Sequence, residues 1–292
     1  VLSNELAKAT WQSFDKANFP FSKWFPKNKA NPKAVLIGIH GFSGAASDFN
    51  NLGTYLSNQN ISLYAYELRG QGNDPDQSRV GDIASVEHWY KDLNSFIKKV
   101  HKETGDAPIF LYGESLGSLI IMHGNSYLDE SIKETIKGVI YASPLIALPG
   151  ELPPVKNFIV RLAMFLFPKM KISIKSLASN QNAQVTSETD HWEQMAKTPH
   201  FVPKYTLRTL GSIEDLVYSS KEVASRITKP TLILYPGKDV FTRPDQVDKF
   251  FGNLKSKDKT KHLFKESHHL LSFDKERERL FEIVERWINK RL

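Results

Sequence analysis

Short apolar runs alternate with longer stretches of helical periodicity along most of the chain. The runs are rich in β-branched and aromatic residues, which favour strands, and the segments between them repeat their apolar residues at helical spacing. This alternation is typical of strand–helix–strand units and predicts a mainly parallel sheet. The runs that predict strands span residues 34–39, 61–66, 108–112, 139–142, 231–235 and 262–264.

Two segments show the helical spacing most clearly. In residues 87–100, Trp89, Leu93 and Phe96 fall on one face of a helix. Amphipathic helices of this kind cover a sheet with their apolar face, so the sequence predicts an α/β fold. The second segment lies near the carboxyl end, where the apolar face is formed by Leu280, Phe281, Val284, Trp287 and Ile288.

The strand–helix rhythm stops between residues 145 and 227. The distance along the chain from the strand at 139–142 to the strand at 231–235 far exceeds what one crossover helix requires. The stretch contains an apolar helix candidate at 155–167. The pattern therefore predicts a core formed by residues 1–144 and 228–292, with a helical cap inserted at 145–227.

The composition is that of a packed domain. Of the 292 residues, 40% are hydrophobic and 24% are charged, which excludes a disordered chain. Lys and Arg exceed Asp and Glu by 39 − 32 = +7, but the lysines are spread along the chain, so we expect no nucleic-acid partner. The absence of cysteine excludes disulfides, thiolate metal sites and a cysteine nucleophile.

No segment of the sequence is long and apolar enough to predict a membrane span. The most apolar stretch, residues 158–167, contains Arg161 and is far shorter than a spanning helix. The chain starts at Val1, which fits a removed signal peptide or a trimmed start. We therefore expect a soluble protein, cytoplasmic or exported after signal-peptide removal. The sequence leaves the compartment and the oligomeric state open.

A serine nucleophile is predicted where residues 113–117 read Gly-Glu-Ser-Leu-Gly, between an apolar strand and an apolar helix pattern. A serine in a tight strand-to-helix turn has a strained backbone and needs small neighbours, which Gly113 and Gly117 supply. The helix that follows brings free amides and a positive dipole end. This context favours a nucleophilic Ser115 over an ordinary glycine-rich turn.

A second glycine-rich loop follows the strand at 34–39 and begins with His40, Gly41 and Phe42. Acyl transfer places negative charge on the former carbonyl oxygen, and two backbone amides commonly stabilise it. We expect these amides to belong to Phe42 and Leu116. The position of His40 before the loop glycine favours a hydrogen bond that organises the loop over a role as catalytic base.

We expect the catalytic acid and base later in the chain, because in proteins with this type of serine turn an Asp or Glu and then a His follow the serine. Asp239 lies in the loop after the strand at 231–235. Its rival, Asp245, follows Pro244 and reads as a helix-start residue. After the last strand come two adjacent histidines, His268 and His269, of which only one can face the serine. The remaining histidines lack metal-ligand spacing, so no metal site is expected.

At this point the sequence resembles the α/β-hydrolase superfamily, and within it the monoacylglycerol lipase and lysophospholipase group. The resemblance implies a mainly parallel sheet with helices on both faces, and its closing motif selects His269 over His268. The sequence departs from the family's usual Asp-x-Arg-Gly-His-Gly motif at Glu67 and Gln71, which are not triad positions. The resemblance rests on the motifs at 40–42, 66–72, 113–117, 237–239 and 267–271, and extends into the cap at 167–177.

The resemblance implies that Ser115 attacks an ester carbonyl while His269, oriented by Asp239, takes its proton. No cofactor is expected, and the implied substrate is a lipid ester with one acyl chain. A small-ester carboxylesterase, an acyltransferase and a peptidase remain alternatives on the same triad; a non-catalytic binding module is less favoured. Cap lysines and Arg161 suggest transient contact with a membrane or micelle surface. Four cap residues either cover the acyl chain or pack against the body: Phe158, Leu162, Phe165 and Leu166.

Overall fold

The computed structural model describes residues 9–26, 31–148, 154–173, 186–187 and 200–292. Parts of the predicted cap, at 149–153, 174–185 and 188–199, lie outside the described residues. The predicted domain boundaries at 145 and 227 stay a prediction.

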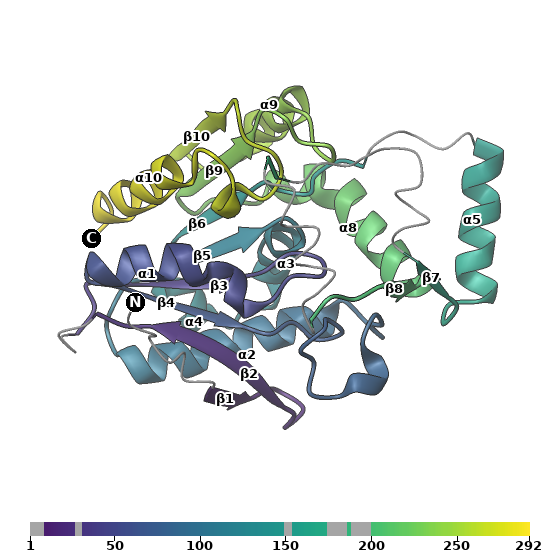
Figure 1. Cartoon of the computed structure of the whole chain (residues 1–292), viewed down its shortest axis with the longest axis horizontal. Helices are drawn as coiled ribbons and strands as arrows, with labels where there is room; N and C mark the ends of the chain where they lie inside the picture. The colour runs from purple at the N-terminus through teal and green to yellow at the C-terminus, as the bar shows by residue number, and fades with distance from the viewer. Residues whose placement is uncertain (1–8, 27–30, 149–153, 174–185, 188–199) are drawn as a thin grey trace.

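An eight-stranded sheet forms the centre of the molecule, in the order β1-β2-β4-β3-β5-β6-β9-β10 (Figure 1). Neighbours from β4 to β10 are parallel, whereas β1 pairs with β2, and β2 with β4, in antiparallel fashion. The predicted mainly parallel α/β fold is therefore confirmed. The strands are β1 Ala9–Gln12, β2 Asn18–Trp24, β3 Ala34–Ile39, β4 Ile61–Tyr66, β5 Ile109–Glu114, β6 Ile136–Ala142, β9 Thr231–Pro236 and β10 Lys259–Phe264.

The two amino-terminal strands were not predicted from the sequence. β1 is short, and β2 contains Pro20, a residue that strands usually avoid. Phe19 and Phe21 alternate with less buried neighbours and face the core, as a strand with one covered face requires. These strands extend the sheet at the edge away from the predicted serine turn.

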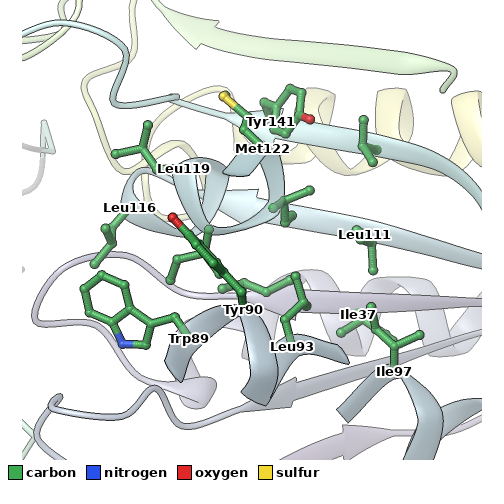
Figure 2. Packing of buried hydrophobic residues seen from close by; sticks show 14 of the residues in the cluster. Ile37, Trp89, Tyr90, Leu93, Ile97, Leu111, Leu116, Leu119, Met122 and Tyr141 are labelled. Atoms are coloured by element: carbon green, nitrogen blue, oxygen red, sulfur yellow. The ribbon is translucent and has the colours of Figure 1, made fainter. Parts of the chain in front are cut away.

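Helices cover both faces of the sheet. One apolar cluster joins the sheet to α1 and α10, and the other joins it to α2, α3, α4, α8 and α9. Figure 2 shows the second cluster, where Trp89 of α2 lies near Leu116 of α3. These helices are α1 Asn50–Asn58, α2 Glu87–Thr104, α3 Leu116–Gly124, α4 Glu130–Thr135, α8 Leu207–Ala224, α9 Pro244–Asn253 and α10 Arg277–Asn289. Single 3-10 turns occur at Ala46–Phe49, Gln77–Arg79, Asn125–Tyr127 and Leu271–Phe273.

The chain between β6 and β9 contributes α5 (Pro154–Leu166), the hairpin strands β7 (Lys171–Ser173) and β8 (Lys204–Thr206), and α8. We call these elements the insert. Helix α8 packs on α3, and α5 stands at the outer side of α8, at the right of Figure 1. The α5–α8 contact includes Met164 beside Gly211 and ion pairs from Arg161 to Glu214 and Asp215. No helix in the described part of the chain is long and apolar enough to cross a bilayer.

Candidate active site

Ser115 occupies the sharp turn between β5 and α3. Its backbone has φ +52° and ψ −113°, a region that residues other than glycine rarely adopt. The Ser115 amide donates to the Ala142 carbonyl of β6 at 3.0 Å, which holds the turn against the neighbouring strand. A Cβ on Gly113 would lie 2.5 Å from the Gly117 carbonyl oxygen, so the turn requires glycine there. The strained strand-to-helix turn is present, and the role of Ser115 as nucleophile stays a prediction.

The loop after β3 lies directly against this serine. A Cβ on Gly41 would lie 3.2 Å from the Ser115 Cβ, a tight contact that glycine avoids. The loop turns tightly, with the Gly44 amide donating to the Gly41 carbonyl at 3.1 Å. Leu116 is the first residue of α3, so its amide has no partner within the helix. The two residues predicted to stabilise an oxyanion, Phe42 and Leu116, therefore flank Ser115 from two segments.

Both ring nitrogens of His40 are engaged by the backbone. Nδ1 donates to the Gly41 carbonyl at 2.9 Å, and Nε2 accepts from the Leu68 amide at 3.0 Å, which is the pattern of a neutral imidazole. Burial lowers the pKa of His40 to about 4, in agreement with that neutral form. These contacts support the loop-organising role and leave no ring nitrogen for proton transfer.

Asp239 and His269 meet at the ends of β9 and β10. The His269 Nδ1 lies 3.1 and 3.0 Å from the two carboxylate oxygens of Asp239, and both side chains are almost fully buried. Burial opposes the charged imidazolium, but the charge and hydrogen bond of Asp239 outweigh it and raise the pKa of His269. The Phe241 amide donates to Asp239 at 2.9 Å and orients the carboxylate. The rival Asp245 is exposed in the first turn of α9 and binds Arg243.

The adjacent histidine, His268, faces a different acid. Its Nδ1 lies 3.0 Å from Asp274, and its backbone amide donates to the same carboxylate at 2.7 Å. Asp274 also accepts hydrogen bonds from Ser187, which lies in the chain between β7 and β8. Neighbouring side chains in the extended loop thus point to separate partners, and this arrangement supports His269 as the partner of Asp239.

The model of the serine aminopeptidase S33 family matches residues 30–276. The chain belongs to this family. The monoglyceride lipase of Saccharomyces cerevisiae is 26% identical, over 96% of this chain and 92% of that protein. A carboxylesterase of Bacillus subtilis is 23% identical, over 90% of this chain and 94% of the relative. The family and these relatives show that the chain is a carboxylic ester hydrolase, similar to monoacylglycerol lipases.

Solved structures support the same fold for this S33-family hydrolase. The soluble variant of the Saccharomyces cerevisiae monoglyceride lipase, in complex with a substrate analogue, superposes with a TM-score of 0.84 at 21% identity, covering 100% of this chain and 97% of that one. The monoacylglycerol lipase of Paleococcus ferrophilus gives 0.77 at 22% identity, covering 94% and 99%. The predicted α/β-hydrolase fold is confirmed.

Two buried carboxyl groups in this S33-family hydrolase were not singled out from the sequence. Glu114, directly before Ser115, is fully buried, and its Oε1 has no hydrogen-bond partner in the described part of the chain. Burial and the nearby Asp48 carboxyl raise the pKa of Glu114 to about 8, whereas His269 acts in the opposite direction. Burial likewise raises the pKa of Asp48 to about 6. The environment of Glu114 therefore favours its protonated form, beside the histidine that binds Asp239.

The four cap residues predicted to cover an acyl chain or to pack against the body lie on the exposed face of α5. Helix α5 contacts α8 through its other face, which includes Arg161 and Met164. The alternative that these four side chains pack against the body is therefore wrong, because α8 covers the opposite side of the helix. Their role at an acyl chain stays a prediction. The exposed fractions are 67% for Phe158, 44% for Leu162, 80% for Phe165 and 55% for Leu166.

The positions that depart from the usual family motif have structural partners. Glu67 accepts a hydrogen bond from the Ala46 amide at 3.2 Å, and Gln71 accepts one from the Ser43 amide at 2.9 Å. Arg69, which matches the motif, forms ion pairs with Asp15 and Asp92. Among the described residues, no group of three or more His, Asp or Glu side chains is arranged to hold a metal ion.

Proposed function

We propose that this hydrolase cleaves carboxylic esters of single-acyl-chain lipids through Ser115, His269 and Asp239. The observation that carries the proposal is the buried Asp239–His269 hydrogen bond at the ends of β9 and β10, on the same sheet edge as the strained Ser115 turn. The names of the relatives support the substrate class: a putative monoglyceride lipase of Schizosaccharomyces pombe is 24% identical, over 88% of this chain and 67% of that protein.

In the proposed mechanism, Ser115 Oγ attacks the ester carbonyl as His269 Nε2 accepts its proton. His269 Nδ1–H donates to Asp239, which fixes the tautomer and stabilises the imidazolium. The amides of Phe42 and Leu116 bind the oxyanion of the tetrahedral intermediate. Collapse of this intermediate releases the alcohol, which takes the proton from His269. A water molecule, activated by the same histidine, then hydrolyses the acyl-enzyme.

Labelling with a fluorophosphonate probe, followed by mass spectrometry of the peptides, tests the nucleophile. The adduct is expected on Ser115. Ser115→Ala should not be labelled, and its esterase rate should be lower by a factor of roughly 10⁴ to 10⁶. Ser126→Ala, an exposed serine after α3, is the matched control and should behave as wild type. An adduct on another serine, or a tenth of the wild-type rate in Ser115→Ala, would contradict the proposal.

The acyl acceptor separates the proposal from the peptidase and acyltransferase alternatives. The family model carries the name of an aminopeptidase, whereas the relatives above carry the names of lipases and esterases. We expect hydrolysis of p-nitrophenyl and glycerol esters, with water as acceptor, and little cleavage of aminoacyl anilides. Faster cleavage of the anilides would favour the peptidase.

A single acyl chain should be recognised by its length. Each methylene that is buried contributes about 0.8 kcal/mol, or nearly fourfold in affinity. The kcat/KM for p-nitrophenyl esters should therefore rise from acetate towards longer chains, and monoacylglycerol should be preferred over triacylglycerol. A steady preference for acetate would favour the small-ester carboxylesterase.

Transient contact with a lipid surface is the final part of the proposal. The exposed face of α5 is apolar from Phe158 to Leu166, and the exposed Lys156, Lys169 and Lys171 flank it. An apolar face bordered by cations is the arrangement with which interfacial helices bind lipid headgroups and acyl chains. The apolar face comprises Phe158, Ile159, Leu162, Phe165 and Leu166, and continues into Phe167 and Met170.

A further inference from the structure

We propose that Gln71 and Tyr205 are positioning residues that hold the Phe42 amide in place to bind the oxyanion. Phe42 and Ser43 belong to the loop after β3, whereas Tyr205 comes from β8 of the insert. The proposal rests on the proposed function, and it assigns part of the catalytic scaffold to the insert.

The side-chain oxygen of Gln71 accepts two hydrogen bonds. One comes from the Ser43 amide at 2.9 Å and the other from the Tyr205 hydroxyl at 2.6 Å. The Ser43 hydroxyl lies 3.0 Å from the Tyr205 hydroxyl and closes a triangle of hydrogen bonds among the three residues. All three residues are buried, so water does not compete for these bonds.

Phe42 is held on both sides by this triangle. Its ring stacks on Tyr205 with 3.9 Å between centroids and 25° between planes. The next residue, Ser43, has φ +56°, a left-handed conformation that is unfavourable for serine and is fixed here by the bond from its amide to Gln71. The Phe42 Cα, to which this amide nitrogen is bonded, is therefore held by an anchored ring and by the anchored peptide that follows it.

The chemistry of Gln71 suits this task better than that of the histidine in the usual family motif. An amide oxygen accepts two hydrogen bonds, whereas a neutral imidazole has one acceptor nitrogen and an imidazolium has none. In the described part of the chain, the Gln71 Nε2 is buried without a hydrogen-bond partner. A buried donor without a partner destabilises the fold, so the acceptor at this position comes at the expense of stability.

Tyr205 is itself fixed to the body. The adjacent Thr206 donates through its amide to the Gly81 carbonyl at 2.8 Å and through its hydroxyl to Asp82 at 2.7 Å. A Cβ on Gly81 would overlap the Lys204 carbonyl oxygen, which shows how closely β8 lies against this loop. Because β8 is anchored, Tyr205 can support the loop after β3 without moving with α5.

The test measures the oxyanion site directly. A short-chain alkyl trifluoromethyl ketone adds to the serine and forms a tetrahedral oxyanion, so its Ki depends on the oxyanion site. We expect Tyr205→Phe, which keeps the ring stack and removes one hydrogen bond, to lower kcat for p-nitrophenyl butyrate and to raise Ki by the same factor, about three- to tenfold. KM should change little. Gln71→Met, which keeps the shape and removes the acceptor, should lose more.

Two further variants separate positioning from general stability. Tyr64→Phe removes a tyrosine hydrogen bond to Glu103, far along the sheet from the site, and should keep the wild-type kcat and Ki. The double variant Gln71→Met/Tyr205→Phe should lose no more than Gln71→Met alone, because both residues act through one bond network. All rates are divided by the fraction of sites that a fluorophosphonate titrates, which corrects for unfolded protein.

If Tyr205→Phe and Gln71→Met keep the wild-type Ki and only their melting temperatures fall, the inference is overturned. The proposed function would still stand. Additive losses in the double variant would also overturn it. The proposed function fails separately if the wild-type protein is neither labelled at Ser115 nor active on esters.

Discussion

The body of the molecule and helix α5 place similar side chains in opposite environments. In the body, Leu111 of β5 is 1% exposed and packs between the sheet and the helices shown in Figure 2. On α5, Phe165 is 80% exposed. Buried apolar area stabilises the fold by about 25 cal/mol per Å², and a side chain left in water contributes little of this. The difference teaches that apolar residues in the body maintain the fold around the site, whereas those on α5 stay exposed, where we propose that they contact lipid.

The largest effect on activity is expected in the body, which contains the proposed catalytic residues. His269→Ala should lower kcat/KM by roughly 10⁴ to 10⁶, because it removes the group that accepts the serine proton. His268→Ala should keep most of the activity, since Asp274 retains its bonds from Ser187 and the backbone. Steady-state rates on p-nitrophenyl butyrate measure both. Equal losses would show that His268 also shapes the site, and the reverse ranking would overturn the assignment.

The next effect concerns stability. Leu111→Ala should lower the free energy of unfolding by about 2–5 kcal/mol, because a buried leucine leaves a cavity. Phe165→Ala should change it by no more than about 0.5 kcal/mol, as expected for an exposed position. Urea unfolding followed by tryptophan fluorescence measures both. A large loss in Phe165→Ala would mean that α5 is packed in solution and would break the comparison.

A further effect is a pH dependence of stability that originates in the body. Burial and Asp48 raise the pKa of Glu114 to about 8 from its ordinary value of 4.5. The folded protein therefore binds more protons than the unfolded chain between these values, so this contribution is complete below pH 4.5 and is lost as the pH rises through 8.

Glu114→Gln replaces the carboxyl with a group that cannot ionise. The variant therefore does not lose this contribution to stability as the pH rises. Between pH 5 and 9, the melting temperature of the wild type should fall more steeply than that of the variant, and scanning calorimetry measures the difference. Asp48 and His269, whose pKa values are also raised, act in the same direction in both proteins. Parallel curves would contradict a raised pKa of Glu114.

Signals that are local in the sequence predicted much of this molecule. The buried parallel strands and the glycines around Ser115 follow from short patterns, and the ends of two strands lead to Asp239 and His269. The two amino-terminal strands were missed, because they are short and contain Pro20.

The remaining features depend on contacts between distant segments. The Gln71–Tyr205 bond joins residues 134 positions apart, and no local pattern indicates it. The raised pKa of Glu114 needs the approach of Asp48 from another segment. For α5, the sequence predicts an apolar helix, but the position of α8 decides which face stays exposed. Tertiary packing therefore supplies what the sequence pattern lacks.

One measurement tests most directly whether the body carries the chemistry and α5 the lipid contact. It compares wild type with Phe158→Ser/Phe165→Ser on p-nitrophenyl butyrate in solution and on monoacylglycerol in phospholipid vesicles. Tyr127→Ser, at an exposed aromatic of the body, is the control. We predict an unchanged kcat/KM on the soluble ester and a kcat/KM on the vesicles that is lower by about tenfold or more. Burial of each phenylalanine in the lipid would contribute about 1.5–3 kcal/mol to binding. Equal losses on both substrates, or no loss on vesicles, would contradict the account.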